Sequence, residues 1–126
     1  MEAIHPMKSQ RISEVPDGSA PELPIEVTTS DYPAIAQRFP FLVIDCWAPW
    51  CGPCKQITPI MEALHEQYRG SMTIGYMNTD ENQDLAMDFG IMGIPTVLVV
   101  KNGQHVDSLV GVMPRAEMER RLREHM

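Results

Sequence analysis

The sequence lacks several features that mark whole classes of protein. Its 126 residues contain no apolar run near the roughly 20 residues that a membrane-spanning helix needs. Positive charge is scarce, because 10 lysines and arginines stand against 17 aspartates and glutamates and leave a net charge of −7. An acidic chain repels phosphate backbones and anionic membranes, so we expect neither nucleic acid nor a membrane as a partner.

Cysteine is also scarce, with only Cys46, Cys51 and Cys54, all within nine positions. This odd, clustered set differs from the paired cysteines of a secreted, disulfide-stabilised domain. Residues 1–24 also lack the apolar stretch of a secretory signal. We therefore expect a cytoplasmic protein that is kept under reducing conditions.

Composition divides the chain near residue 25. Residues 1–24 are rich in proline and poor in aromatic and β-branched residues. Such a segment has too little apolar surface to offset the entropy lost on ordering, so we expect a flexible tail, with a short docking arm as the alternative. Residues 25–126 have the length and apolar content of one folded domain.

Apolar patterning predicts alternating strands and helices in this domain. After a short extended start, a helix is expected to end near Arg38, before a proline. The run "FLVIDC" then predicts a central strand buried on both faces. A second helix is expected to follow the cysteines and to extend to about Tyr68, because its apolar residues have helical spacing.

The C-terminal half continues the pattern. A strand near "MTIGYMNTD" and a short helix ending at Gly90 precede two strands joined by Asn102-Gly103, a strong hairpin signal. A last helix follows Pro114. The order βαβαβαββα predicts an α/β fold with a central mixed sheet flanked by helices.

Cys51 and Cys54 form a CxxC pair that could serve as metal ligands, a structural disulfide or a redox couple. Structural zinc needs four ligands, and the histidines are scattered, so we expect no metal. A structural disulfide would close a loop of only about four residues and would gain little loop entropy. Thiol–disulfide exchange is therefore the best-supported use, and a CxxC beside a βαβ pattern is typical of it.

The predicted positions of the two cysteines make them unequal. Cys51 falls where a strand gives way to a helix, and the unpaired N–H groups of a helix N-terminus stabilise a thiolate. We therefore expect the pKa of Cys51 to be lowered and Cys51 to be the attacking nucleophile. Cys54 lies one turn later and is expected to be more buried, so that it resolves the mixed disulfide.

The segment "DCWAPWCGPCK" resembles the active site of the thioredoxin family, "FGIMGIPTVLVVKNG" resembles the family's second signature, and "LVG" its third substrate-facing element. The resemblance covers about residues 25–126 and implies the thioredoxin fold. It implies a monomeric protein-disulfide reductase and electron carrier that needs no cofactor. A thioredoxin reductase would regenerate it, and disulfide-containing proteins would be its targets.

Two other functions stay open on the sequence. One is a more oxidising disulfide oxidase or isomerase, which Pro53 disfavours because that proline resembles the family's mark of a reducing protein. The other is a non-catalytic adaptor with the same fold, which the intact cysteine pair disfavours.

The resemblance also implies roles for individual residues. Gly52 and Pro53 would hold the active-site turn, and Pro95 would follow a cis peptide bond that faces the cysteines. The expected substrate-binding residues are Trp50, Gly93, Ile94, Pro95, Gly111 and Val112.

Asp45 is the third expected catalytic residue. It lies inside an apolar run, where an ionised carboxylate is costly to bury. The resemblance places a buried aspartate here, so desolvation should raise its pKa and allow it to take the Cys54 proton. Two positions depart from the family pattern: Tyr76 replaces a common lysine, and Cys46 replaces a common aromatic residue. We expect Cys46 to pack in the core.

Overall fold

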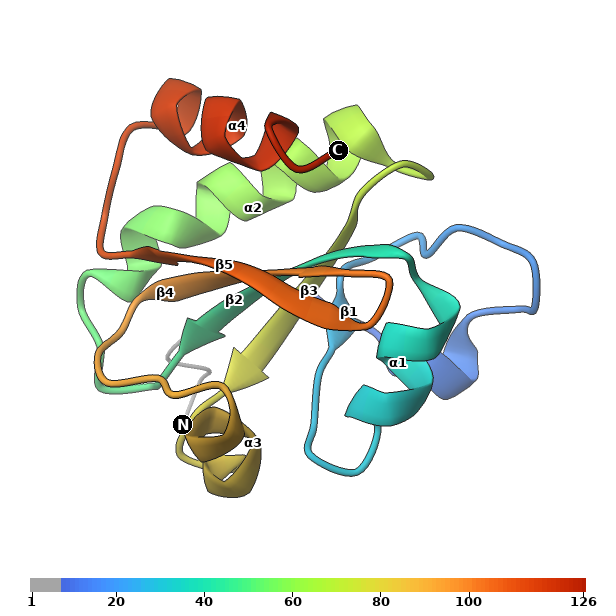
Figure 1. Ribbon diagram of the computed structural model, residues 1–126, viewed down its shortest axis with the longest axis horizontal. Helices are drawn as coiled ribbons and strands as arrows, with labels where there is room; N and C mark the ends of the chain where they lie inside the picture. Colours follow the sequence, from blue (N-terminus) through green and yellow to red (C-terminus); the bar gives the residue numbers. More distant parts are fainter. Residues whose placement is uncertain (1–7) are drawn as a thin grey trace.

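A mixed β-sheet forms the centre of the molecule in a computed structural model that describes residues 8–126 (Figure 1). Within those residues the sheet has five strands in the order β1-β3-β2-β4-β5. Strands β1, β3 and β2 are parallel, whereas β4 and β5 are antiparallel to their neighbours. The strands are β1 (Ile25–Glu26), β2 (Phe41–Trp47), β3 (Thr73–Asn78), β4 (Thr96–Lys101) and β5 (Gln104–Val110).

Helices cover both faces of this sheet. Helices α2 and α4 lie on one face, and α1 and α3 lie on the other (Figure 1). The helices are α1 (Tyr32–Arg38), α2 (Cys54–Tyr68), α3 (Gln83–Asp88) and α4 (Arg115–Arg123). The predicted order βαβαβαββα and the three-layer α/β architecture are confirmed.

Strand β2 lies at the centre of both core layers. Its alternate side chains point to opposite faces, so Val43 packs with α2 and α4, whereas Leu42 and Cys46 pack with α1 and α3. Both faces are therefore buried, which explains why the strand is almost continuously apolar. Cys46 has no exposed surface, which confirms its predicted packing role, and burial raises the pKa of its thiol.

The hairpin between β4 and β5 has the predicted turn. Asn102 and Gly103 both have positive φ, at 52° and 81°. A two-residue turn of this kind requires positive φ at both central positions, which asparagine and glycine adopt at low cost. The turn fixes β5 beside β4, and β5 leads back toward the cysteines and into α4.

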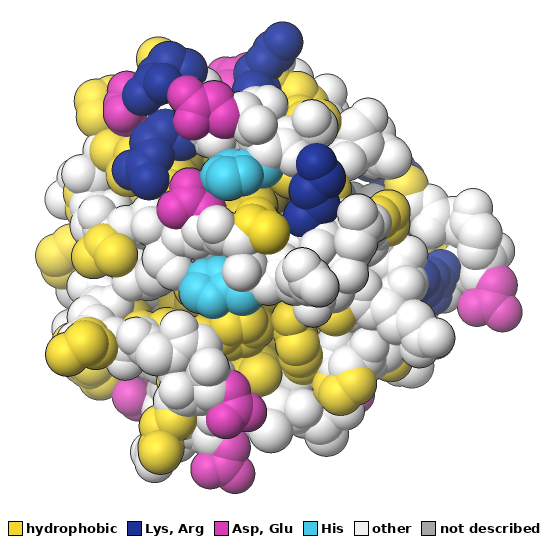
Figure 2. All heavy atoms as spheres, viewed as in Figure 1, with side chains coloured by type: hydrophobic (Ala, Val, Ile, Leu, Met, Phe, Trp, Pro, Cys, Tyr) yellow, Lys and Arg dark blue, Asp and Glu magenta, His cyan; other side chains and the backbone are white. Residues whose placement is uncertain are grey.

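The outer surface of α4 is highly charged. Figure 2 shows acidic and basic side chains gathered over this helix. Arg120 contacts Glu117 at 2.9 Å and Glu124 at 2.8 Å. The inner surface of α4 carries Met118 and Leu122, which are fully buried against the sheet. The helix is therefore amphipathic, as its spacing predicts.

The structure of the N-terminal segment differs from the flexible tail predicted for residues 1–24. Residues 8–24 pack against the domain, so a flexible tail over residues 1–24 is wrong for this part; residues 1–7 lie outside the described residues. Gln10 forms a bridge with Ile25 at the edge of the sheet, and Val15 is buried in the core next to α1.

Two arginines of the domain hold the same segment. Arg38 donates to the carbonyl of Val15 at 3.0 Å and to that of Pro16, and Arg69 donates to the carbonyl of Pro21 at 3.1 Å. These bonds to backbone acceptors, together with a few apolar anchors, offset the ordering entropy that composition alone suggested was too large.

Candidate active site

The cysteine pair lies where β2 leads into α2. Cys51 and Cys54 are joined by a disulfide, with Cα atoms 5.4 Å apart. Cys54 is the first residue of α2, and Pro53 is its N-cap. Cys54 has no exposed surface and Cys51 is 4% exposed, so Cys54 is the more buried of the two, in the predicted order. Gly52 and Pro53 lie exposed in the intervening turn.

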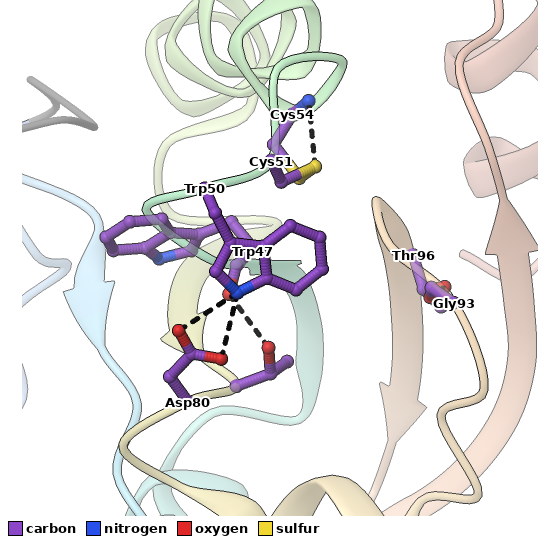
Figure 3. The surroundings of a disulfide bond; sticks show 8 residues. Trp47, Trp50, Cys51, Cys54, Asp80, Gly93 and Thr96 are labelled. Atoms are coloured by element: carbon purple, nitrogen blue, oxygen red, sulfur yellow. Dashed lines mark hydrogen bonds between the residues drawn. A yellow bond between two sulfur atoms is a disulfide. The ribbon is translucent and has the colours of Figure 1, made fainter.

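The sulfur of Cys51 lies at the N-terminus of α2. The backbone N–H of Cys54 donates to Cys51 Sγ, with 3.2 Å between nitrogen and sulfur (Figure 3). This amide is among the first-turn donors of the helix, which have no partner within the helix and carry partial positive charge. The arrangement therefore favours negative charge on Cys51 Sγ.

An exposed indole lies beside the disulfide. Trp50 is 70% exposed, and its Nε1–H donates to both carboxyl oxygens of Asp80, at 3.2 and 3.1 Å (Figure 3). Asp80 follows β3, and its own backbone N–H donates to Asn78 Oδ1 at 2.9 Å. Asp80 therefore holds the Trp50 ring from a neighbouring loop. Sequence reasoning missed Asp80, because a contact across 30 residues leaves no local signal.

The loop before β4 faces the cysteines. Its Ile94-Pro95 peptide bond is cis, as the resemblance implies, and Ile94 packs against the cluster that contains both cysteines. Thr96 Oγ1 donates to the carbonyl of Gly93 at 2.6 Å (Figure 3), and Gly111 N–H donates to the carbonyl of Pro95 at 2.9 Å. The expected groove residues therefore lie at one end of the sheet, in three segments: the cysteine loop, the loop before β4, and the end of β5.

Apolar side chains at this end are exposed. Met92 is 99% exposed and Val112 is 45% exposed, in addition to Trp50. Exposed apolar side chains around a reactive group are typical of a surface that binds another protein. Gly93, beside Met92, is also exposed, whereas Pro95 is buried beneath the surface.

Asp45 is completely buried in β2. Neither of its carboxyl oxygens has a hydrogen-bond partner among residues 8–126. Burial raises the pKa of Asp45 to about 8. An ionised carboxylate is poorly solvated there, so the side chain is protonated at neutral pH and can exchange a proton near that pH.

Tyr76 is the in-register neighbour of Asp45 on β3. It is 2% exposed, and burial, followed by the charges of Asp45 and Glu62, raises the pKa of its hydroxyl well above the usual value. Tyr76 is therefore a neutral hydroxyl beside a buried carboxyl group, at the position where the resemblance leads one to expect a lysine.

The described residues contain no group of three or more histidine, cysteine and acidic side chains that could hold a metal ion. In the same part of the chain, no helix is both long and apolar enough to cross a membrane.

Comparisons with known proteins agree with the site geometry. A family profile for thioredoxins matches residues 24–124. A thioredoxin of Porphyra purpurea is 35% identical over 115 residues, which cover 91% of this chain and 97% of that protein. A thioredoxin of Haemophilus influenzae is 41% identical over 85 residues, 68% of this chain and 79% of that protein.

A solved structure shows the same architecture. A mutant thioredoxin from Halobacterium salinarum matches with a TM-score of 0.74 and 27% sequence identity, over 80% of this chain and 88% of that one. The fold is therefore the thioredoxin fold, as predicted. With its CGPC disulfide at the start of α2, this chain belongs to the thioredoxin family and is a thiol–disulfide oxidoreductase that uses a cysteine pair in place of a cofactor.

Proposed function

We propose that this protein reduces disulfides in target proteins by cycling Cys51 and Cys54 between the dithiol and the disulfide, and that a thioredoxin reductase regenerates it. The observation that carries the proposal is the contact of Cys51 Sγ with the Cys54 amide at the N-terminus of α2. In the reduced protein the same amide would stabilise the Cys51 thiolate and lower the pKa of that thiol. Cys51 is therefore the attacking cysteine.

The reaction begins when the Cys51 thiolate attacks a target disulfide. A bond forms between Cys51 and one target sulfur, and the other target sulfur leaves as a thiolate. The Cys54 thiol then gives its proton to a base, and the resulting thiolate attacks Cys51 Sγ, which forms the disulfide seen here and releases the second target thiolate. The target gains two electrons, and the cysteine pair loses two.

In the fraction of molecules in which Asp45 is ionised, its carboxylate accepts the proton that Cys54 loses. Its raised pKa, about 8, lies close to that of an ordinary thiol, so a proton can move between the two groups at little cost. An aspartate with its usual pKa would be a far weaker base. The complete burial of Asp45 is therefore what suits it to this step.

The target would bind as an extended segment across the loop before β4. Among residues 8–126, neither the N–H nor the C=O of Ile94 takes part in a hydrogen bond. A target strand can pair with these groups. Trp50, Gly93, Gly111 and Val112 would contact its side chains, and Pro95 would form the floor of the groove.

The protein would act as a monomeric electron carrier in the cytoplasm. Exposed apolar residues cluster around the cysteines, where target and reductase would bind in turn. The small, clustered set of three cysteines suits a reducing compartment.

Trapping of the intermediate tests this function. The reduced Cys54→Ser variant is mixed with a disulfide-bonded target protein, and the covalent product is measured by mass spectrometry. It should form one mixed disulfide per molecule, through Cys51, and should not turn over. Cys51→Ser should form none, although it keeps one thiol of the pair. Equal trapping by the two variants would contradict the assignment of Cys51 as nucleophile.

Turnover by the unmodified protein separates the alternatives. A reductase should transfer electrons from a dithiol to the target at a rate that is at least about a thousandfold above that of Cys51→Ser. An adaptor would bind targets without reducing them, and an oxidase would instead form disulfides in reduced targets.

A further inference from the structure

The loop before β4, residues 90–95, carries a methionine whose side chain lies almost wholly in solvent. Met92 is 99% exposed, whereas Ile91 before it and Ile94 after it pack against the core. An exposed thioether gains nothing from burial in the folded protein, so Met92 does not stabilise the core. Three further apolar side chains are exposed on the segments that meet at this end of the sheet: Trp50, Val110 and Val112. Met92 therefore belongs to an exposed apolar surface beside the cysteine pair.

The backbone on both sides of Met92 is fixed. The Ile91 N–H donates to the carbonyl of Ala86 in α3 at 3.0 Å. The Gly93 carbonyl accepts from Thr96 Oγ1 at 2.6 Å, in the part of the loop that faces the cysteine pair (Figure 3). The loop therefore presents the Met92 side chain to solvent from a backbone that is bonded to α3 on one side and to β4 on the other.

Met92 lies close to the place where a target would bind. It is two residues before Ile94, whose backbone groups pair with the target strand in the function proposed above. Two residues span at most about 7 Å, so the Met92 backbone is near that pairing site. Methionine is long, unbranched and polarizable, which suits it to contact side chains of varied shape. A target strand bound at Ile94 would therefore cover part of the Met92 side chain.

The other methionines of residues 8–126 are less exposed. Met87 in α3 is 77% exposed, Met126 is 49% exposed, and Met113 is half-buried. A peroxide must reach the sulfur of a methionine to oxidise it, so exposed methionines react first. Met92 combines the highest exposure with a place beside the cysteines. Four methionines lie in the core with 1% exposure or less: Met61, Met72, Met77 and Met118.

We propose that Met92 is a modification site, which peroxides convert to the sulfoxide, and that the sulfoxide weakens the binding of target proteins. The inference rests on the function proposed above, in which a target binds across the loop before β4. It adds a reversible loss of activity under oxidising conditions, because enzymes that reduce methionine sulfoxide restore the thioether.

The oxidation step needs only the peroxide. With hydrogen peroxide, a lone pair of the Met92 sulfur attacks one peroxide oxygen, an S–O bond forms and the O–O bond breaks. The other oxygen leaves as hydroxide and takes up a proton to become water. The sulfur is oxidised by two electrons, and the peroxide is reduced by two.

The sulfoxide changes what a target meets at this loop. Covering a thioether removes apolar surface from water, which favours binding. A sulfoxide is polar and its oxygen accepts hydrogen bonds from water, so a target that covers it must displace that water. Binding is therefore weaker, whereas the cysteine pair is unchanged and the rate within the bound complex is retained.

Peroxide treatment of the full chain tests the proposal. Hydrogen peroxide is added to the disulfide form, in which Cys51 and Cys54 have no free thiol and Cys46 is buried. The peroxide is removed, and mass spectrometry of peptides locates each added oxygen. Dithiothreitol, which reduces the disulfide but not the sulfoxide, then supplies electrons while kcat and KM for a disulfide-bonded target protein are measured.

Two variants, Met92→Leu and Met87→Leu, are treated in the same way. Each keeps an apolar side chain of similar size that cannot form a sulfoxide. Met87→Leu is the matched control, because Met87 is also highly exposed but lies in α3.

In the unmodified protein, Met92 and Met87 should gain oxygen before the buried methionines, and the KM should rise about fivefold with kcat unchanged. Met87→Leu should show the same rise after peroxide, and Met92→Leu should show none. A methionine sulfoxide reductase should return the KM of the treated, unmodified protein to its value before treatment.

Two results would overturn the proposal. One is an unchanged KM when mass spectrometry shows that Met92 is oxidised; the other is an equal rise in KM for Met92→Leu, which would assign the effect to another methionine. Failure of the underlying function is seen before peroxide is added. If the untreated protein does not reduce the target, the proposed function fails and this inference fails with it. If the untreated protein reduces the target and oxidation of Met92 leaves the KM unchanged, only this inference fails.

Discussion

Asp45 and Asp107 show how one residue type serves two purposes in the same sheet. Asp45 lies in the central strand β2, is completely buried, and has no hydrogen-bond partner among residues 8–126. Asp107 lies in the edge strand β5 and is half-buried. Its carboxylate accepts from His125 Nε2 at 2.9 Å and from the Ser108 N–H at 2.8 Å, and Arg121 lies 3.6 Å away.

The surroundings shift the two pKa values in opposite directions. Burial raises the pKa of Asp45 to about 8. Burial alone would also raise the pKa of Asp107, but the hydrogen bonds from His125 and the Ser108 amide, together with the charge of Arg121, outweigh it and hold that pKa below its usual range. The difference therefore comes from the partners of each carboxylate.

A carboxylate with partners contributes to stability, whereas one without partners costs stability. Asp107 ties β5 to the C-terminal end of α4 through His125 and Arg121. Asp45 ties nothing together, and the sheet is less stable for its presence when it is ionised. A group that is costly to the fold but matched in pKa to a thiol is what a proton acceptor requires.

The largest expected effect is the gain in stability when Asp45, whose ionised carboxylate destabilises the fold, is replaced by asparagine. Because the folded-state pKa of Asp45 is raised, the folded protein holds its proton longer than the unfolded chain does, and stability falls as the pH rises from about 4 to about 8. One group with this shift lowers the free energy of unfolding by roughly 6 kcal/mol in total. We expect Asp45→Asn to remove most of this loss.

Urea unfolding of the oxidised proteins at a series of pH values measures this effect. The two proteins should have similar stability near pH 4, where Asp45 of the unmodified protein is largely protonated. Near pH 9 the Asp45→Asn variant should be more stable by roughly several kcal/mol. Parallel curves for the two proteins would show that Asp45 is not the group responsible, and would remove the contrast with Asp107.

The second prediction concerns the other member of the pair. Asp107→Asn should lower the free energy of unfolding by about 1 kcal/mol near pH 7, because the contacts with His125 and Arg121 are partly exposed and screened by water. The folded-state pKa of Asp107 is lowered, so its contribution is present above the unfolded pKa and is lost as the pH falls through the folded pKa.

The loss of stability caused by Asp107→Asn should therefore disappear in acid. The gain of stability caused by Asp45→Asn should also disappear in acid, so the two variants differ from the unmodified protein in opposite directions at higher pH. Thermal unfolding against pH checks both. The reduction of a target by Asp107→Asn should be unchanged, since Asp107 is remote from the cysteine pair in the fold. A stabilised Asp107→Asn protein would contradict the view that the partners of this carboxylate decide its contribution.

The contrast also shows what the sequence can and cannot predict. The buried position of Asp45 follows from the run "FLVIDC", and the placement of Cys51 and Cys54 at the start of α2 follows from the strand-to-helix junction. These are local patterns, and local patterns persist in the fold. The hairpin at Asn102-Gly103 is predicted for the same reason, because those residues suit positive φ.

Contacts between segments that are distant in the chain leave no such local pattern in the sequence. The N-terminal segment is held by Arg38 and Arg69, which donate to backbone carbonyls that every sequence has. The partner of Trp50 is likewise set by the packing of β3 next to β2, and the partner of Asp107 by the end of α4. Such pairings depend on the tertiary arrangement and become visible only in the structure.

A third carboxylate, Asp80, extends the comparison to the smallest effect. It is exposed, and its carboxylate contacts the Trp50 indole. Asp80→Ala should change the free energy of unfolding by less than about 0.5 kcal/mol. It should raise the KM for a protein target about threefold, because a freed indole must be ordered when the target binds, and leave kcat unchanged. Asp88→Ala, an exposed aspartate in α3, is the matched control and should change neither quantity. An equal KM for Asp80→Ala and Asp88→Ala would mean that the bond to Trp50 does not position the ring for target binding.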